Sequence, residues 1–167
     1  MTAIIGVISD THGLLRPAAK SALAGCDLIV HAGDIGKPHV LEELAEIAPV
    51  TAIRGNVDAW TEELPDNDVV EIEGRYLYVL HNIELLDLDP RAAGFDAVIF
   101  GHSHVPAVYT RDGVLYLNPG SAGPRRFKLP IALALLTVSE TALDARIVEL
   151  SVRAPTSDVR AGLRTKR

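Results

Sequence analysis

Hydrophobic and polar positions alternate in blocks along the first third of the chain. Three apolar runs have the length of buried strands, and they cover residues 3–8, 27–31 and 50–54. The two segments between them, 17–24 and 38–48, both open on a proline, which suits a first helical turn because proline has no amide hydrogen to leave unpaired. This βαβαβ order predicts a parallel sheet.

The remainder of the chain is predicted to be mostly strand. Three short polar segments are typical of hairpin turns, and they lie at 73–75, 111–113 and 139–141. An α/β beginning followed by strands predicts an α/β protein with two facing sheets and helices outside. The predicted strands cover 69–72, 76–80, 96–100, 105–110, 114–118, 131–138 and 142–149, and a short helix is expected at 89–93.

The composition is that of one globular unit. The 167 residues suffice for one domain with a substantial core, and 48% of them are hydrophobic. No apolar run approaches the roughly 18 residues that a membrane helix needs. The chain starts on a predicted strand rather than a leader, and its single cysteine, Cys26, is expected to pack rather than to form a disulfide. We therefore expect a cytoplasmic protein without a membrane partner.

Charge is distributed unevenly along the sequence. The formal net charge is -6, yet residues 153–167 are predominantly basic. We expect a metallo-domain over residues 1–152 and a basic, flexible tail over 153–167, because chain ends of this composition are often disordered. The alternative is a tail that binds an acidic partner. The acidic body argues against stable nucleic-acid binding, since phosphate attraction requires clustered basic residues.

Five short motifs carry side chains that bind metals, and nearly every one follows a predicted strand. Ligands in α/β sheets gather beyond the carboxyl ends of the strands, so the five motifs are expected to converge. Carboxylate, amide and imidazole donors without thiolate suit manganese, iron, zinc, cobalt or nickel. The motifs are Asp10-Thr11-His12, Gly33-Asp34, Gly55-Asn56-Val57-Asp58, His81 and Gly101-His102-Ser103-His104.

Spacing within the motifs predicts which side chains bind together. Residues i and i+2 of an extended segment face the same way, so Asp10 is expected to chelate with His12, and His102 with His104. The glycines that precede three of the motifs allow sharp turns or close approach of the backbone. Each motif alone occurs by chance, but the ordered set, which holds four of the six histidines, predicts one dinuclear metal site.

This ordered set resembles that of the calcineurin-like metallophosphoesterases, and the small size is similar to their compact bacterial and archaeal phosphodiesterase branch. Residues 117–121, Leu-Asn-Pro-Gly-Ser, are also similar to a segment that follows the last metal motif there. The resemblance covers residues 3 to about 150. It implies a metallophosphoesterase-like α/β fold, a four-layer αββα sandwich of two mixed sheets, with the metals at one edge of the sheets.

The resemblance also implies roles for the motif residues. Two divalent metal ions per chain are expected, manganese first, with nickel, cobalt, iron, zinc or magnesium as alternatives. The implied reaction is hydrolysis of a phosphodiester through attack by a hydroxide that bridges the metals. The implied ligands are Asp10, His12 and His104 for one ion, Asn56, His81 and His102 for the other, and Asp34 for both; Asp34, Asn56 and Asp58 are expected to serve catalysis.

Several residues near the motifs keep two interpretations. Val57 stands where many family members have a histidine that contacts phosphate or donates a proton, so the general acid is not identified. Asn82 stands where many members have glycine.

Asp58 is placed either to orient a ligand histidine or to cap a turn. His31 is expected to be structural and His39 to face solvent. Arg54, Arg125 and Arg126 either clamp phosphate or lie in solvent, and Trp60 and Phe127 either line a pocket or pack in the core.

Three functions fit these features. The first is a dinuclear metal-dependent phosphoesterase acting on a small phosphodiester, with nucleotides among the candidate substrates. The second is a non-catalytic interaction scaffold, because the retromer scaffold subunit resembles this fold, and the third is a phosphomonoesterase or protein phosphatase. The complete set of seven ligands favours an enzyme, and the short loops favour a small diester over a protein substrate. By similarity to compact relatives, a homodimer is expected.

Overall fold

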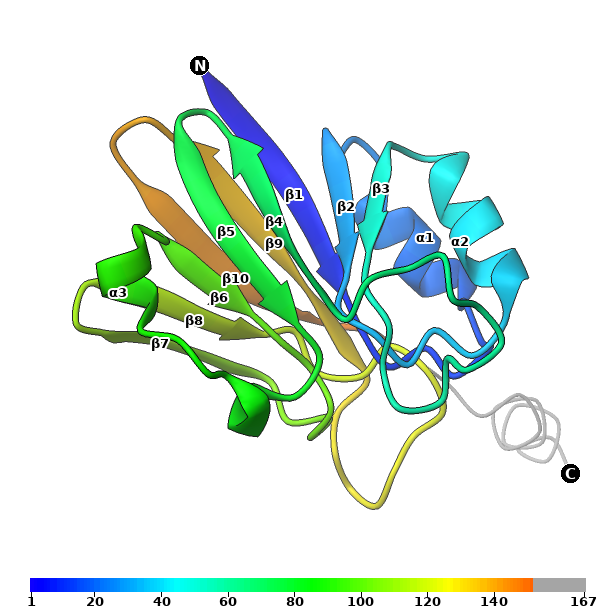
Figure 1. Cartoon of the computed structure of the whole chain (residues 1–167). Coiled ribbons are helices and arrows are strands. Elements are labelled where there is room, and N and C mark those ends of the chain that lie inside the picture. Colours follow the sequence, from blue (N-terminus) through cyan, green and yellow to red (C-terminus); the bar gives the residue numbers. More distant parts are fainter. Residues whose placement is uncertain (152–167) are drawn as a thin grey trace, which may run out of the picture.

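The protein folds into two five-stranded sheets packed face to face (Figure 1), as seen in a computed structural model that describes residues 1–151. The predicted tail at 153–167 lies outside the described residues. In spatial order, the first sheet contains β10 (Leu143–Glu149), β9 (Ala132–Ser139), β1 (Thr2–Ile8), β2 (Leu28–His31) and β3 (Val50–Ala52). The second contains β4 (Asn67–Ile72), β5 (Arg75–Leu80), β6 (Ala97–Ile99), β8 (Val114–Asn118) and β7 (Ala107–Arg111).

Both sheets mix parallel and antiparallel pairs. Strands β1, β2 and β3 run parallel, which confirms the predicted βαβαβ beginning, and β9 pairs with β1 in the antiparallel sense. In the second sheet β5, β6 and β8 run parallel. The three predicted hairpins join β4 to β5, β7 to β8 and β9 to β10.

Alternation of side chains along the strands builds the interior. In β9, Ala134, Leu136 and Val138 face the second sheet, whereas Leu133 faces the helices on the other side. This is the period of two that a strand requires, here with both faces buried. Burial of each such large side chain contributes about 1.5–3 kcal/mol. The apolar centre between the sheets therefore holds the two sheets together and fixes the positions of the strand ends.

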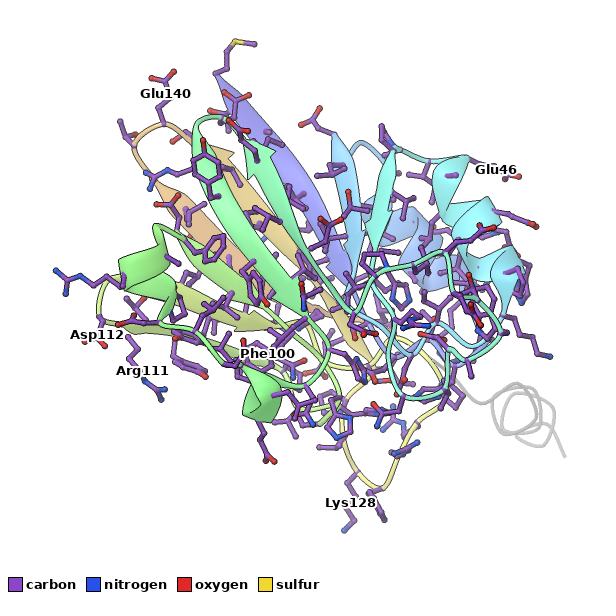
Figure 2. All side chains as sticks on the ribbon, in the orientation of Figure 1. Glu46, Phe100, Arg111, Asp112, Lys128 and Glu140 are labelled. Carbon is purple, nitrogen blue, oxygen red and sulfur yellow. The ribbon has the colours of Figure 1, made fainter. Side chains whose placement is uncertain are left out.

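The two outer layers differ in thickness. Helices α1 (Pro17–Leu23) and α2 (Pro38–Ala45) cover the outer face of the first sheet, and both start at the predicted prolines. The second helix is shorter than the predicted 38–48, because a turn begins after Ala45. Within residues 1–151, the outer face of the second sheet, which includes Phe100 (Figure 2), is covered by the segment holding η1 (Ile83–Leu85) and α3 (Pro90–Ala93).

The αββα prediction is thus confirmed, with a thin fourth layer. Among residues 1–151, no helix is long and apolar enough to cross a membrane. The carboxyl ends of β1, β2, β3, β5 and β6 meet at one edge of the sandwich, and the three hairpin turns lie at the opposite end (Figure 1). Residues that follow those five strands are therefore brought together.

Candidate metal centre

Side chains from four strand ends converge at this edge. His81, which follows β5, has its Nε2 atom 3.3 Å from Oδ2 of Asp34. His104 lies beyond β6, and its Nε2 atom is 3.3 Å from Oδ1 of Asp10. His12 joins them, with Nε2 3.6 Å from Oδ2 of Asp34. Two carboxylates therefore lie between three imidazoles, as the motif set predicts.

Several polar atoms of this group are buried without a hydrogen-bond partner among the described residues. They are Oδ1 of Asp10, Nε2 of His12 and Nε2 of His81. Nδ1 of His104 is also without a partner, and the other ring nitrogen of His104, Nε2, faces Asp10. A buried polar atom without a partner costs about 1–3 kcal/mol. The Nε2 atoms of His81 and His104 lie 3.3 to 3.8 Å from carboxylate oxygens of Asp10 and Asp34. A divalent cation fits this group, because it would accept electron pairs from the carboxylate and imidazole atoms together.

Each carboxylate has one oxygen anchored by the protein and one directed into the site. Oδ2 of Asp10 accepts hydrogen bonds from Ser9 Oγ, at 2.7 Å, and from the His102 amide, at 3.1 Å. Oδ1 of Asp34 accepts a hydrogen bond from the Val57 amide at 3.0 Å. These bonds fix the rotation of both side chains. The free oxygens, Oδ1 of Asp10 and Oδ2 of Asp34, are the ones that face the histidines.

The tautomer of His81 is set by the backbone. Nδ1 lies 2.7 Å from the Ala32 carbonyl oxygen, which only accepts hydrogen bonds, so Nδ1 carries a proton and the neutral ring has its lone pair on Nε2. Burial alone lowers the pKa of His81, but the Asp34 contact, the Ala32 hydrogen bond and the charge of Asp10 raise the pKa above its usual value. Burial likewise opposes ionisation of Asp34, yet His81 and the Val57 amide hold the pKa of Asp34 below its usual value. The site thus favours a positive charge beside these carboxylates.

The reasoning from extended backbone is wrong, although the ligands converge. Asp10, His12 and Asp34 have φ values of 56°, 46° and 57°, and His102 and His104 have values of 71° and 66°. All five lie in the left-handed region, which non-glycine residues adopt at a cost. Tight turns, rather than strand alternation, therefore aim these side chains.

The histidines of the last motif face different partners instead of chelating together. The His104 ring lies 5.4 Å from the His12 ring, and the His102 ring lies 5.2 Å from the His81 ring. Two imidazole pairs result, His12 with His104 and His81 with His102. The division of the ligands between two ions stays a prediction from the family resemblance.

The glycines of the motifs serve close approach, as predicted. A Cβ on Gly33 would stand 2.6 Å from Nδ1 of His81, and one on Gly101 would stand 2.7 Å from Oδ2 of Asp10. A Cβ on Gly55 would overlap the backbone and carboxylate of Asp34. Side chains at these three positions would push the ligand loops apart.

Two predicted ligands lie at the rim of the site. Asn56 and His102 are exposed, unlike the buried Asp10, Asp34, His81 and His104. Asn56 lines a cavity of about 390 Å³ together with His81. The centre therefore has a buried floor and an open side that a substrate can reach.

Asp58 does not orient a ligand histidine. Its buried carboxylate accepts hydrogen bonds from the amides of Ile35, Gly36 and Gly55, at 2.8 to 3.1 Å, and from the Trp60 indole at 3.2 Å. These bonds tie the loop after Asp34 to the loop that carries Asn56. These contacts match the capping interpretation, and the expected part of Asp58 in catalysis stays a prediction.

His31 is structural, as expected. It is fully buried; its Nδ1 accepts from the Gly33 amide, and its Nε2 lies 2.9 Å from Thr11 Oγ1. Thr11 gives its own proton to the Ile35 carbonyl, so Nε2 of His31 is the donor. Burial lowers the pKa of His31 to about 4 despite the nearby charges of Asp10 and Asp58. A neutral imidazole therefore joins the first two metal-motif loops.

The arginine and aromatic candidates have separate outcomes. Arg54 is paired with Asp66 through two nitrogens, at 3.0 and 3.2 Å. Arg125 and Arg126 are exposed on the loop after β8, which also carries Lys128 (Figure 2). Burial lowers the pKa of His12, and the charge of Arg126 acts in the same direction. Trp60 and Phe127 are exposed at 40% and 89%, so neither aromatic side chain packs in the core. His39 is exposed, as expected.

Sequence reasoning missed the residues that hold the ligand loops in place. Asn118 donates through Nδ2 to the Gly101 carbonyl, at 3.0 Å, and to Ser103 Oγ, at 3.1 Å. Ser121 Oγ donates to the Asp10 carbonyl at 3.0 Å. The Asn-Pro-Gly-Ser segment was a visible signal for this role, whereas nothing in the sequence distinguishes Ser9 from other serines.

Comparison with known proteins agrees with this geometry. Residues 4–141 match the family model of the calcineurin-like phosphoesterase superfamily domain. The chain belongs to this superfamily, which places it among metal-dependent phosphoester hydrolases.

Individual relatives support the same assignment. A probable metallophosphoesterase of Methanothermobacter thermautotrophicus is 33% identical over 161 residues, covering 87% of this chain and 91% of the relative. A phosphodiesterase of Methanocaldococcus jannaschii is 27% identical over 137 residues, covering 70% of this chain and 82% of the relative. Among solved structures, Vacuolar Protein Sorting 29 from Cryptosporidium parvum has a TM-score of 0.73 at 19% identity, covering 90% of this chain and 99% of that one. The last similarity shows the fold alone.

Proposed function

We propose that the protein is a dinuclear metal-dependent phosphodiesterase. The observation that carries this proposal is the set of buried, unpaired atoms of Asp10, His12 and His81 around the free oxygen of Asp34. Such a group is costly in a folded protein and has no structural use, since its atoms satisfy no neighbour. Its donors suit divalent first-row ions, of which manganese is our first choice.

The ligands divide into two groups that share Asp34. Asp10, His12 and His104 would hold one ion, and Asn56, His81 and His102 the other. Two divalent ions held there would lower the pKa of a bound water and neutralise charge on phosphate oxygens. The relative described as a phosphodiesterase supports a diester as substrate.

The chain's own residues fix the geometry of this reaction. Ser9 and the His102 amide hold Asp10, and the Val57 amide holds Asp34, so neither carboxylate rotates when the substrate arrives. Preorganised groups of this kind need no rearrangement in the transition state. The Val57 side chain is 47% exposed and has no proton to donate. The leaving group therefore departs as an anion or takes its proton from water or from another residue.

A scaffold without catalysis is the second candidate, because the Cryptosporidium parvum protein shares the fold. An interaction surface does not require four histidines and two carboxylates to converge with unpaired atoms. The ligand set of this chain therefore favours the enzyme.

A hydrolysis panel tests the proposal. Metal-stripped protein is reloaded separately with manganese, nickel, cobalt, zinc or magnesium and given aryl phosphomonoesters, aryl phosphodiesters and cyclic nucleotides. We expect metal-dependent hydrolysis, fastest for the diesters, and its loss in Asp34→Asn. Absence of hydrolysis with every metal would support the scaffold, and a preference for monoesters would exclude diester specificity.

A further inference from the structure

Apart from Asn56 and His81, the residues that line the cavity beside the metal centre have no part in the proposed mechanism. The cavity measures about 390 Å³ and is continuous with Asn56 and His81. Small-molecule sites in proteins usually measure about 300–1,000 Å³. The cavity is therefore large enough for an organic group attached to the reacting phosphate.

The walls combine apolar and hydrogen-bonding surfaces. Leu80 and Tyr78 are buried beneath it, and Leu85, on η1, stands exposed at 72% beside it. Asn67 and Asn82 contribute amide groups. Apolar faces with a few placed polar groups are what a ring bearing hydroxyl or amino groups would contact.

The charges on the lining disfavour an anion. The cavity has two carboxylates, Asp66 and Asp87, against one guanidinium, Arg54. Arg54 is already engaged, since its three nitrogens donate to Asp66 and to the Thr61 carbonyl. Asp87 accepts no hydrogen bond from the described residues, so it has free capacity for donors such as sugar hydroxyls.

We propose that this cavity, lined by Asn67, Tyr78, Leu85 and Asp87, binds an uncharged, nucleoside-like ester group of the phosphodiester substrate. The inference rests on the proposed function, whose substrate class it narrows. Asp87 accepts hydrogen bonds from the hydroxyl or amino groups of the ligand, and Tyr78 and Leu85 contact its ring. An ester group that carries a carboxylate is repelled.

The test uses two 4-nitrophenyl phosphodiesters, one with thymidine as the second ester group and one with a carboxyalkyl group. The Asp87→Lys variant reverses the charge at an exposed position. We expect it to lower the ratio of kcat/KM for the thymidine diester over the carboxyalkyl diester by about five- to tenfold, from two unit charges in high dielectric. The matched control is Asp144→Lys, at an exposed position of β10 outside the cavity, and it should leave the ratio unchanged.

A second measurement does not depend on catalysis. Thymidine is titrated into metal-free protein, and backbone amide shifts are followed by NMR. We expect the shifts to change at residues 66–67 and 82–87 and to weaken in Asp87→Lys. Shifts elsewhere, or none at millimolar thymidine, would overturn the assignment.

The two proposals fail in different ways. If both diesters are hydrolysed but Asp87→Lys leaves their ratio unchanged, the cavity assignment is wrong and the phosphodiesterase stands. If no phosphoester is hydrolysed with any metal, the proposed function is wrong, and the thymidine titration alone decides whether the cavity binds nucleosides.

Discussion

The two ends of the sandwich use the same unusual backbone conformation for different purposes. At the hairpin end, Glu73 and Asp112 have φ values of 50° and 52°, and each is followed by a glycine with positive φ. These are the turns that match the twist of two paired strands. At the metal end, the left-handed residues are the ligands themselves, among them Asp10, His12 and Asp34.

Polar side-chain atoms also differ in their hydrogen bonding at the two ends. Near the hairpins, Arg75 donates to the carbonyls of Ser139 and Glu140 and to the Asp96 carboxylate, so each nitrogen has a partner. Near the metal ligands, imidazole nitrogens and a carboxylate oxygen are buried without partners. A strained backbone conformation costs about 1–3 kcal/mol per residue, and an unpaired buried atom also costs free energy. Both persist where a bound ligand would compensate for their cost. The difference indicates which end is selected for chemistry.

The largest expected effect is on catalysis. Asp34→Asn removes the shared carboxylate charge, and because metal ions supply several kcal/mol of charge stabilisation, we expect kcat/KM for an aryl diester to fall by roughly 10³-fold or more. The matched change at the hairpin end, Asp112→Asn, should leave kcat/KM unaltered. Full activity in Asp34→Asn would show that the carboxylate at the metal end matters no more for catalysis than the one at the hairpin end.

Glycine substitutions compare strain at the two ends directly. Gly33 and Gly74 both have positive φ, but a Cβ on Gly33 would meet the His81 ring, and one on Gly74 would meet nothing within 4 Å. We expect Gly33→Ala to lower the free energy of unfolding of the metal-free protein by about 2–5 kcal/mol. Gly74→Ala should cost about 1–2 kcal/mol. Urea titration measures both, and equal losses would contradict the comparison.

Because His31 is buried and neutral, we expect the protein to lose stability in acid. The pKa of His31 is about 4 in the folded protein, below the usual histidine value of 6.5, so the unfolded chain binds the proton more readily. Its contribution is complete above about pH 6.5 and is lost as the pH falls toward 4, a change of about 3 kcal/mol. We compare urea unfolding of metal-free wild type and His31→Gln across this window. If the free energies of unfolding of the two proteins changed in parallel with pH, the lowered pKa assigned to His31 would be contradicted.

The smallest effect concerns the leaving group. Because Val57 has no proton to donate, rates should depend steeply on the leaving-group pKa, and aryl diesters should react much faster than alkyl diesters. Val57→His should raise the rate for alkyl diesters by at least about tenfold, toward the 10²–10⁴ typical of general acids. A shallow dependence in the unmodified enzyme would mean that another group already donates the proton.

The fold was largely predictable because its signals are local. Apolar runs, prolines at helix starts and hairpin turns predicted each strand approximately and both main helices. Their boundaries differ by a few residues, as at the end of α2, where capping decides. The turn η1 was missed, although Asn82 caps it by accepting a hydrogen bond from the Glu84 amide.

The site was predictable as a set of residues but not as a geometry. The motif order identified Asp10, Asp34, His81 and the others, yet the sequence suggested extended backbone where the ligands are left-handed. The contacts of Asp58 with the Ile35 and Gly36 amides come from another loop, which no local pattern reveals. The hydrogen bond from Asn118 to the Gly101 carbonyl depends on tertiary packing in the same way.

Metal stoichiometry tests the central claim most directly. Metal-stripped protein is titrated with manganese by calorimetry, and the bound metal is counted after dialysis. The account predicts two ions per chain in the wild type, a rise in Tm on loading, and weakened binding at both sites in Asp34→Asn. One ion per chain at saturation, or two ions bound equally well without Asp34, would contradict it.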